Sequence, residues 1–301
     1  MSGPPNQFEP PLFSVVTVTF NLVEGGRSAS IRRAAESLWA QNFHSVEHIV
    51  QDGGSNDGTQ TLLGAIVADA SDHVPTYLES EPDKGIYDGM NRAVARANGR
   101  YVIFLNSDDL LGEPDALQKL AEPLKAGDCD FAFGLTAMID PDTGARKLLS
   151  RPSLEAVLQR MPFGHNATAF RRGLFDDLGG HDLSFPVASD YDFVLRMVAA
   201  GSKGERVDAV VSQFLKGGAS ANAEAVRRDY AAIWGKVYGP WVDLSGDDQA
   251  TRELWHKAGH MPFRIPFAIW RNRQLAPGIR RAAWHSMMKS LRRTLTGRGL
   301  R

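Results

Sequence analysis

The stretch Tyr101-Val102-Ile103-Phe104-Leu105-Asn106-Ser107-Asp108-Asp109 joins a hydrophobic run to a cluster of oxygen ligands. Five consecutive apolar residues, rich in aromatic and β-branched types, predict a central strand of a sheet that is covered on both faces. In open α/β sheets, ligands bind outside the carboxyl ends of such strands. The stretch therefore predicts an α/β fold with a ligand site just after residue 105.

Two adjacent carboxylates at the end of a strand need a compensating interaction. Asp108 and Asp109 repel each other unless they are solvated, hydrogen-bonded or bridged by a cation. Hard oxygen ligands of this kind suit Mg²⁺ or Mn²⁺. Alternatively, Ser107, Asp108 and Asp109 cap the next helix, because Ser and Asp are good N-cap residues. Taken alone, the stretch leaves both interpretations open.

Strand and helix patterns alternate along the chain, which is typical of βα units and a mostly parallel sheet. Upstream of the central strand we predict strands at 13–20, 47–51 and 76–79 and helices at 29–41, 59–70 and 86–97. Downstream, the alternation loosens. There we predict strands at 131–139 and 167–170 and helices at 114–126, 153–160, 172–178 and 189–200.

Composition and patterning indicate three regions in this chain of 301 residues, 43% of them hydrophobic. Residues 1–11 are polar and Pro-rich and predict a disordered leader without a secretory signature. Residues 12–222 are expected to form one catalytic domain, followed by a helical C-terminal region at 223–301. Cys129 is the single cysteine, which excludes an intramolecular disulfide and agrees with a reducing compartment.

No stretch reaches the roughly 18 apolar residues that a membrane-spanning helix requires. We therefore expect a cytoplasmic protein, either free or peripheral on the inner face of the cell membrane. The segment after Glu253 contains no Asp or Glu, but it contains Lys257 and ten further Lys or Arg residues.

Aromatic and basic residues are interleaved in this segment, as they are in interfacial helices on an anionic leaflet. Alternatively, its helices pack on the catalytic domain or form a homo-oligomer contact. Nucleic-acid binding is not expected, because no recognised motif accompanies the basic residues.

Three loops after the predicted strands carry groups suited to a nucleotide. Asp52 can accept hydrogen bonds from a base or a ribose, and Gly53 and Gly54 allow a ligand to approach the backbone. Lys84 can face a phosphate. The alternative for Asp52 is a role in an Asx-turn, and for Lys84 a solvated position on the surface.

Four blocks together resemble the family-two inverting glycosyltransferases, in order and in spacing. These blocks are Thr19-Phe20-Asn21, Val50-Gln51-Asp52-Gly53-Gly54-Ser55-Asn56-Asp57-Gly58-Thr59, Asp83-Lys84-Gly85-Ile86-Tyr87-Asp88-Gly89-Met90-Asn91 and Asn106-Ser107-Asp108-Asp109. The resemblance covers roughly residues 13 to 220. It implies a GT-A fold, in which a D-x-D-like motif binds a metal ion on the diphosphate of a sugar nucleotide.

The resemblance also implies roles for single residues. The residues expected to contact the donor nucleotide are Thr19, Asn21, Asp52, Asp83, Lys84 and Ser107. Asp108 is the expected chief ligand of Mn²⁺ or Mg²⁺, with help from Asn106 or Asp109. Many relatives have Asp where this chain has Asn106, which offers only a neutral carbonyl oxygen.

Inversion requires a base opposite the leaving diphosphate. Ser189-Asp190-Tyr191-Asp192-Phe193-Val194-Leu195-Arg196 resembles the family block E-D-x-D-x-x-L-R, which makes Asp190 the base. The alternative is that Asp190 caps the helix or complements its dipole. Asp192 lies about 200° around the helix from Asp190, so we interpret it as structural.

The remaining predicted site residues are expected to contact the acceptor or the diphosphate. His165 belongs to this group, with a structural histidine as the alternative. Lys216, Gly217 and Gly218 resemble a loop that closes over the diphosphate. The Q-x-x-R-W block of processive synthases is absent from the sequence, which indicates one sugar transfer per acceptor.

The sequence thus predicts a metal-dependent, non-processive transferase. It would move one sugar from a UDP- or GDP-sugar to a glycan or lipid-linked acceptor. Two rival functions are a nucleotidyltransferase, for which Gly25-Gly26-Arg27 is a candidate triphosphate loop, and a non-catalytic sugar-nucleotide-binding protein of the same fold.

Overall fold

A computed structural model of the chain describes residues 10–127, 129–140, 143–149, 152–215 and 222–295. Its contacts divide the chain into two compact units, which we describe separately. The first unit contains residues 1–151, 163–180 and 204–216, and the second contains 152–162, 181–203 and 217–301. The division by contacts therefore does not coincide with residue 222, and a catalytic domain over 12–222 stays a prediction about function.

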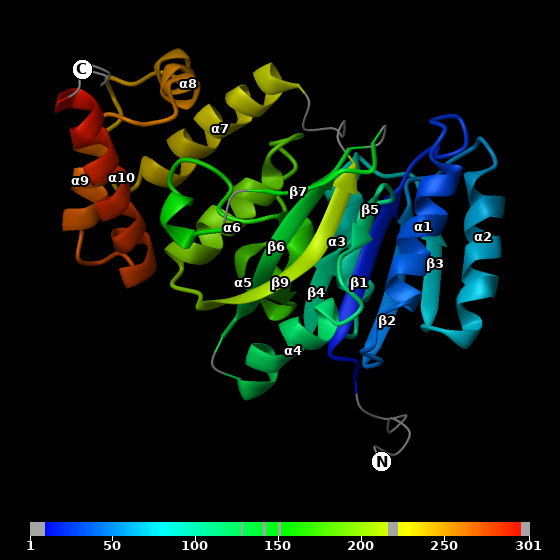
Figure 1. Cartoon of the computed structure of the whole chain (residues 1–301). Helices are drawn as coiled ribbons and strands as arrows, with labels where there is room; N and C mark the ends of the chain where they lie inside the picture. Colours follow the sequence, from blue (N-terminus) through cyan, green and yellow to red (C-terminus); the bar gives the residue numbers. More distant parts are fainter. Residues whose placement is uncertain (1–9, 128, 141–142, 150–151, 216–221, 296–301) are drawn as a thin grey trace. The chain divides into compact units, whose positions relative to one another are not determined.

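All nine strands of the described sheet lie in the first unit (Figure 1). They are β1 (Phe13–Thr19), β2 (Val46–Asp52), β3 (Thr76–Ser80), β4 (Tyr101–Phe104), β5 (Asp109–Leu111), β6 (Phe131–Ile139), β7 (Arg146–Leu148), β8 (Thr168–Arg171) and β9 (Gly204–Leu215). Their order is β3-β2-β1-β4-β8-β6-β9-β5, with β7 paired to β6. Strands β1 to β4 are parallel, as predicted, whereas the sheet beyond β4 is mixed.

Helices cover both faces of this sheet. They are α1 (Ser28–Trp39), α2 (Thr59–Asp69), α3 (Ile86–Arg96), α4 (Ala116–Ala126) and α5 (Gly173–Leu178), with short 3₁₀ turns at Ala70–Asp72 and His165–Ala167. Helices α1 and α4 bury apolar residues against Phe13, Val15 and Ile103. The side chains that alternate with these face α3 and α5. The central strands are therefore buried on both faces, as their apolar runs predict.

A short strand follows the polar cluster of the central strand. Asp109 begins β5, which pairs antiparallel with β9, and α4 begins only at Ala116. The interpretation of Ser107, Asp108 and Asp109 as caps of the next helix is therefore wrong.

The second unit is helical. Its helices are α6 (Ser189–Ala199), α7 (Ala223–Tyr238), α8 (Gln249–Ala258), α9 (Arg264–Arg271) and α10 (Pro277–Leu295), with a 3₁₀ turn at Leu154–Ala156. Its core includes Tyr191, whose ring stacks on Tyr230 at 4.1 Å and whose hydroxyl accepts a hydrogen bond from Trp234 Nε1. The predicted helical C-terminal region is confirmed. Among the described residues, no helix combines the length and the hydrophobicity needed to cross a bilayer.

One buried histidine in the sheet makes the free energy of unfolding depend on pH. Burial lowers the pKa of His48 in β2 from 6.5 to about 4, and its Nε2 lies 2.9 Å from Thr17 Oγ1. The unfolded chain binds this proton near pH 6.5 and the folded protein only near pH 4. Stability is therefore fully present above pH 6.5 and falls by about 3 kcal/mol as the pH drops toward 4.

We expect His48→Gln to flatten this part of the stability profile, because the amide can still bond Thr17 but does not titrate. Urea unfolding at about pH 7 and about pH 4.5 measures the effect. The matched control is His44→Gln, since His44 is exposed. Equal loss of stability with acid in all three proteins would contradict the prediction.

Candidate active site

The carboxyl ends of β1, β2 and β3 meet around the carboxylate of Asp52. Thr19 and Ser80 are its register partners on the two neighbouring strands. Asp52 is fully buried, and its Oδ1 accepts from Thr19 Oγ1 at 3.0 Å and from Ser55 Oγ at 2.5 Å. Its Oδ2 accepts from Ser55 N at 2.8 Å and from Ser80 Oγ at 2.6 Å. These four bonds fill the capacity of a carboxylate and fix the three strand ends together.

The loop after β1 is fixed to the loop after β2. Asn21 has a positive φ of 43° and donates its backbone N–H to Ser55 Oγ at 2.8 Å. Leu22 N donates to the buried Thr59 Oγ1, also at 2.8 Å. The predicted nucleotide residues Asn21 and Asp52 therefore both contact Ser55.

The two glycines after Asp52 allow a close approach of the loop that follows β3. A Cβ on Gly53 would lie 2.8 Å from Asp83 Oδ2, and one on Gly54, whose φ is +79°, would lie 2.9 Å from Pro82 N. The sequence interpretation gave this space to a ligand. In the structure, the chain's own Pro82 and Asp83 occupy it.

Asp83 and Lys84 lead into α3. Asp83 Oδ1 accepts from Gly85 N at 2.9 Å, and Lys84 donates its backbone N–H to Asp88 Oδ2 at 3.0 Å. The Lys84 side chain is exposed and has no ion-pair partner among the described residues. Its ammonium group is thus available to an anion beside the loop that contacts Asp52.

At the end of β4, the two adjacent carboxylates differ in environment. Asp109 is 5% exposed, and its Oδ2 accepts from Asn106 Nδ2 at 2.8 Å and from Asn166 Nδ2 at 2.9 Å. Burial raises the pKa of Asp109 to about 6; the two amide bonds oppose the rise, and the charge of Asp108 adds to it. Asp108 is only half-buried. Asp109 is therefore hydrogen-bonded inside the fold, whereas Asp108 is partly open to solvent.

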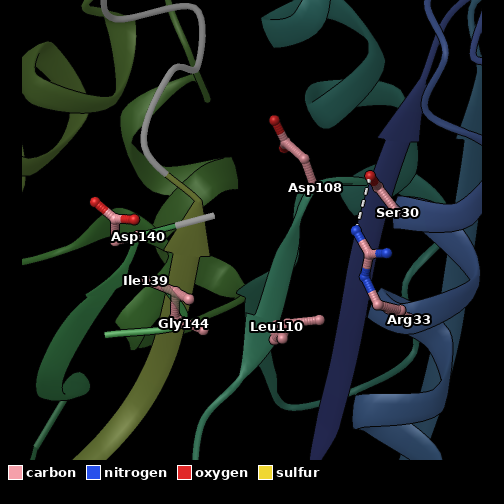
Figure 2. A pocket seen from close by; sticks show the side chains of 7 residues that line it. All are labelled: Ser30, Arg33, Asp108, Leu110, Ile139, Asp140 and Gly144. Atoms are coloured by element: carbon pink, nitrogen blue, oxygen red, sulfur yellow. Dashed lines mark hydrogen bonds between the residues drawn. The ribbon is translucent and has the colours of Figure 1, made fainter. Parts of the chain in front are cut away.

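Asp108 lines a pocket of about 340 Å³ in the first unit. Figure 2 shows Ser30 and Arg33 of α1 on one side, Ile139, Asp140 and Gly144 on the other, and Leu110 below Asp108. Arg33 donates to Ser30 Oγ at 3.3 Å. The pocket thus combines an apolar floor, a guanidinium group and carboxylates, and its size lies near the lower end of the usual range of about 300–1,000 Å³ for small-molecule sites.

The side chains at this strand end fit a metal ion that takes few protein ligands. No group of three His, Cys, Asp or Glu side chains suited to a metal occurs in the described parts of the chain. However, Asn106 Oδ1 is a buried oxygen without a hydrogen-bond partner among these residues, two positions from Asp108. Mg²⁺ is commonly held by one or two such ligands, with water and substrate phosphates completing its shell.

His165 and Ser107 lie in the same unit as this cluster. The His165 ring stacks on Phe104 of β4, with centroids 4.5 Å apart, and Ser107 is buried. Asn166, beside His165, contacts both Asp109 and Ser212 Oγ. Asn166 was not predicted as a positioning residue, although it directly follows the predicted site residue His165 in the sequence.

Asp190 belongs to the second unit, in the first turn of α6. Its Oδ1 accepts from Tyr191 N at 2.8 Å, and the residue at the N-cap position is Ala188. The buried Asp229 of α7 accepts from Val187 N and Ala188 N, which fixes the start of this helix. Asp190 is therefore not the N-cap, and its roles as a base and as a partner of the helix dipole both stay open.

Asp192 points into the second unit, in agreement with its structural interpretation. Its side chain is fully buried and forms ion pairs with Arg196 Nε at 2.7 Å and Lys236 Nζ at 3.2 Å. The predicted phosphate loop, Lys216, Gly217 and Gly218, lies outside the described residues.

Sequence comparison assigns the family. Residues 14–186, more than half of the chain, match the model of glycosyl transferase family 2. This chain belongs to that family. An uncharacterized glycosyltransferase of Mycobacterium tuberculosis is 34% identical over 191 residues, which cover 62% of this chain and 68% of the relative. A PGL/p-HBAD biosynthesis glycosyltransferase of Mycobacterium bovis is 28% identical, with 62% and 69% covered.

Solved structures of glycosyltransferases share the fold of this family 2 member. The mannosyltransferase PcManGT from Pyrobaculum calidifontis, in complex with GDP-Man and Mn²⁺, has a TM-score of 0.58 at 17% identity. That match covers 96% of this chain and 77% of PcManGT. S. aureus TarS in complex with UDP-GlcNAc also has a TM-score of 0.58 at 17% identity, with 94% and 92% covered. The predicted GT-A-like α/β fold with a helical C-terminal region is confirmed, and the chain is a glycosyltransferase.

Proposed function

We propose that this glycosyltransferase moves one sugar from a UDP- or GDP-sugar to an acceptor hydroxyl, with inversion. The observation that carries the proposal is the position of Asp52, Asp83 and Asp108 in one unit, each at or shortly after the carboxyl end of a parallel strand of one sheet. Ligands of open α/β sheets bind at this edge. The complexes of PcManGT with GDP-Man and of TarS with UDP-GlcNAc support a donor of this class.

In this proposal, Asp52 receives the base or the ribose, with Thr19 and Asn21 beside it. Because Asp52 already accepts four bonds, the donor displaces the hydroxyl of Ser55 or Ser80 and takes over its acceptor site. A hydroxyl turns at little cost, so the pocket stays hydrogen-bonded in both states. Lys84 and His165 contact the phosphates in this proposal, and the sequence resemblance predicts the same role for Lys216, Gly217 and Gly218, which lie outside the described residues.

Asp108 and the carbonyl oxygen of Asn106 would hold Mn²⁺ or Mg²⁺. When bound, the ion supplies positive charge that stabilises the departing diphosphate. Asp109 acts as a positioning residue, since it receives the amide of Asn106 and thereby turns that residue's carbonyl oxygen away from itself. Ser107, which is buried in the same turn, contacts the donor nucleotide in this proposal.

Asp190 removes the proton of the acceptor hydroxyl, and the hydroxyl oxygen attacks the anomeric carbon as the bond to the diphosphate breaks. The acceptor is a glycan or a lipid-linked glycan, and we place its nearest polar groups in the pocket of Arg33 and Asp140 beside Asp108. The PGL/p-HBAD biosynthesis role in the name of one relative supports an acceptor of this kind. We further propose a cytoplasmic enzyme that is free, peripheral on the inner membrane face or homo-oligomeric.

A thermal-shift screen of UDP-, GDP- and dTDP-sugars, each with and without Mn²⁺, tests the donor and the metal. A donor present at about 100 times its Kd adds about 2.7 kcal/mol to stability, which raises Tm by several degrees. We expect one donor class to do so and the rise to depend on Mn²⁺. Release of a nucleotide diphosphate from that donor distinguishes a transferase from a nucleotidyltransferase, which releases pyrophosphate. No shift with any donor would contradict the proposal.

A further inference from the structure

Helices α9 and α10 of the second unit carry a connected row of large apolar side chains, in which Phe267 and Trp270 are half-buried and the others are exposed. Ring contacts run from Phe263 to Phe267 at 5.6 Å, from Phe267 to Trp270 at 6.1 Å and from Trp270 to Trp284 at 5.4 Å. On α10, the ridge continues through Met288, Leu291 and Leu295. We call these seven residues the apolar ridge.

The α10 part of the ridge is one exposed face of a helix. Trp284, Met288, Leu291 and Leu295 are spaced by four, three and four residues and are 43, 42, 39 and 80% exposed. The opposite face of α10, with Ile279 and Ala282, is buried. The exposed side chains are thus not needed for the packing of α10, and a row of large apolar residues in water marks a binding surface.

Cations flank the ridge. Arg271 lies over the Phe267 ring at 5.6 Å, and Arg273 and Arg281 are exposed and without an ion-pair partner among the described residues. No Asp or Glu follows Glu253 in the sequence. Of the acidic residues elsewhere in this unit, Glu155 pairs with His285 and Asp247 with Arg264. Arg273 and Arg281 therefore carry positive charge that no ion pair within the described part of the chain neutralises.

We propose that the apolar ridge and its flanking arginines bind the surface of an anionic bilayer. Apolar side chains enter the boundary between headgroups and acyl chains, and the arginines face the lipid phosphates, as in interfacial amphipathic helices. The aromatic rings suit this boundary because they combine a large apolar area with polar edges. The described helices do not span a bilayer, so this contact is peripheral.

Charge favours a membrane over a second copy of the chain. A symmetric dimer across the ridge would bring the same arginines of two copies together, and Glu155, a carboxylate that contacts α10, already pairs with His285. The phosphates of a nucleic acid would pair with the arginines, but they would leave Met288, Leu291 and Leu295 without an apolar partner. An anionic bilayer offers phosphates to the arginines and acyl chains to the apolar side chains.

Sedimentation of the full chain with vesicles tests the proposal. The vesicles contain phosphatidylcholine alone or mixed with phosphatidylglycerol at about three to one. We expect sedimentation only with the anionic vesicles, weakened by salt. Trp284→Ala should lower the partition coefficient roughly tenfold, and Arg281→Gln roughly fivefold at low salt.

Two variants of exposed residues outside the ridge serve as controls. Leu254→Ala removes an apolar side chain of α8 that is 58% exposed, and Arg228→Gln removes a cation of α7. Both should sediment as the unchanged protein does. Absence of binding to anionic vesicles, or equal binding by all variants, overturns the proposal.

Two other results would also contradict the proposal, because each would indicate a binding partner other than a membrane. The first is self-association without lipid that Trp284→Ala abolishes, and the second is binding of a duplex oligonucleotide without binding of vesicles. The assay measures partition alone, so its result is independent of whether the proposed sugar transfer is confirmed.

Discussion

Asp190→Asn is expected to lower kcat roughly 10²- to 10⁴-fold while the affinity for the sugar nucleotide stays nearly unchanged. An amide has almost the shape of the carboxylate but cannot take a proton, so acceptor activation is lost and donor binding is not. Turnover with the identified donor measures the first effect, and the thermal shift caused by that donor measures the second.

The structure supplies the control that separates a base from a residue that only complements a helix dipole. Asp176 is an exposed Asp in the first turn of α5, as Asp190 is in the first turn of α6. Asp176→Asn changes a helix dipole contact in the same way and should leave kcat unchanged. Near-normal turnover of Asp190→Asn would show that its position reflects helix stability alone.

The first four strands and their helices could be predicted because each is a local pattern. Strand β4 is an uninterrupted apolar run, and β1 is rich in valine and threonine. Each is followed or preceded by a helix with regular spacing. Strand β9 was missed because it opens with Gly204, Glu205 and Arg206. Its Val207 to Val211 stretch is the signal that could have revealed it.

Strand β5 could not be found from periodicity, because it has only three residues. It forms by pairing with β9 across about a hundred positions of sequence, as the register of Asp109 with Phe214 shows. Only the folded sheet brings these two segments together. For this reason, the stretch taken alone left the choice between metal ligands and helix caps open, and only its resemblance to a family motif favoured the metal.

The site residues at strand ends could be predicted, whereas their partners could not. Asp52 and Asp108 were predicted from their position after apolar strands. By contrast, the contact of Asp109 with Asn166 joins residues 57 positions apart. Asp108 lies in the turn before β5 and is half-buried, whereas Asp109 begins the strand and is buried where Asn106 and Asn166 donate to it.

The buried Asp109 also gives a physical reason for the unusual Asn106. An Asp at position 106 would place a second carboxylate where Asn106 Nδ2 now donates to Asp109 at 2.8 Å. Two carboxylates in that position would repel each other, and one would have to bind a proton. An amide avoids this cost, because it donates to Asp109 through nitrogen and keeps its oxygen for another partner.

Apart from the buried Asp109, Asp108 is the only charged residue with which this turn can bind a metal. Asp108→Asn should therefore weaken Mn²⁺ binding strongly. We expect turnover to fall roughly 10²- to 10³-fold, the range found when one group that stabilises transition-state charge is removed. Calorimetric titration of Mn²⁺ in the presence of a nucleotide diphosphate measures the binding directly.

The matched control for Asp108→Asn is Asp115→Asn. Asp115 precedes α4 in the same unit, pairs with Lys119 at 3.0 Å on the surface and does not line the pocket of Asp108. The variant Asp115→Asn should alter neither Mn²⁺ binding nor turnover. If Asp108→Asn bound Mn²⁺ as the unchanged protein does, the metal site would have to be elsewhere, and the orphaned oxygen of Asn106 would need another partner.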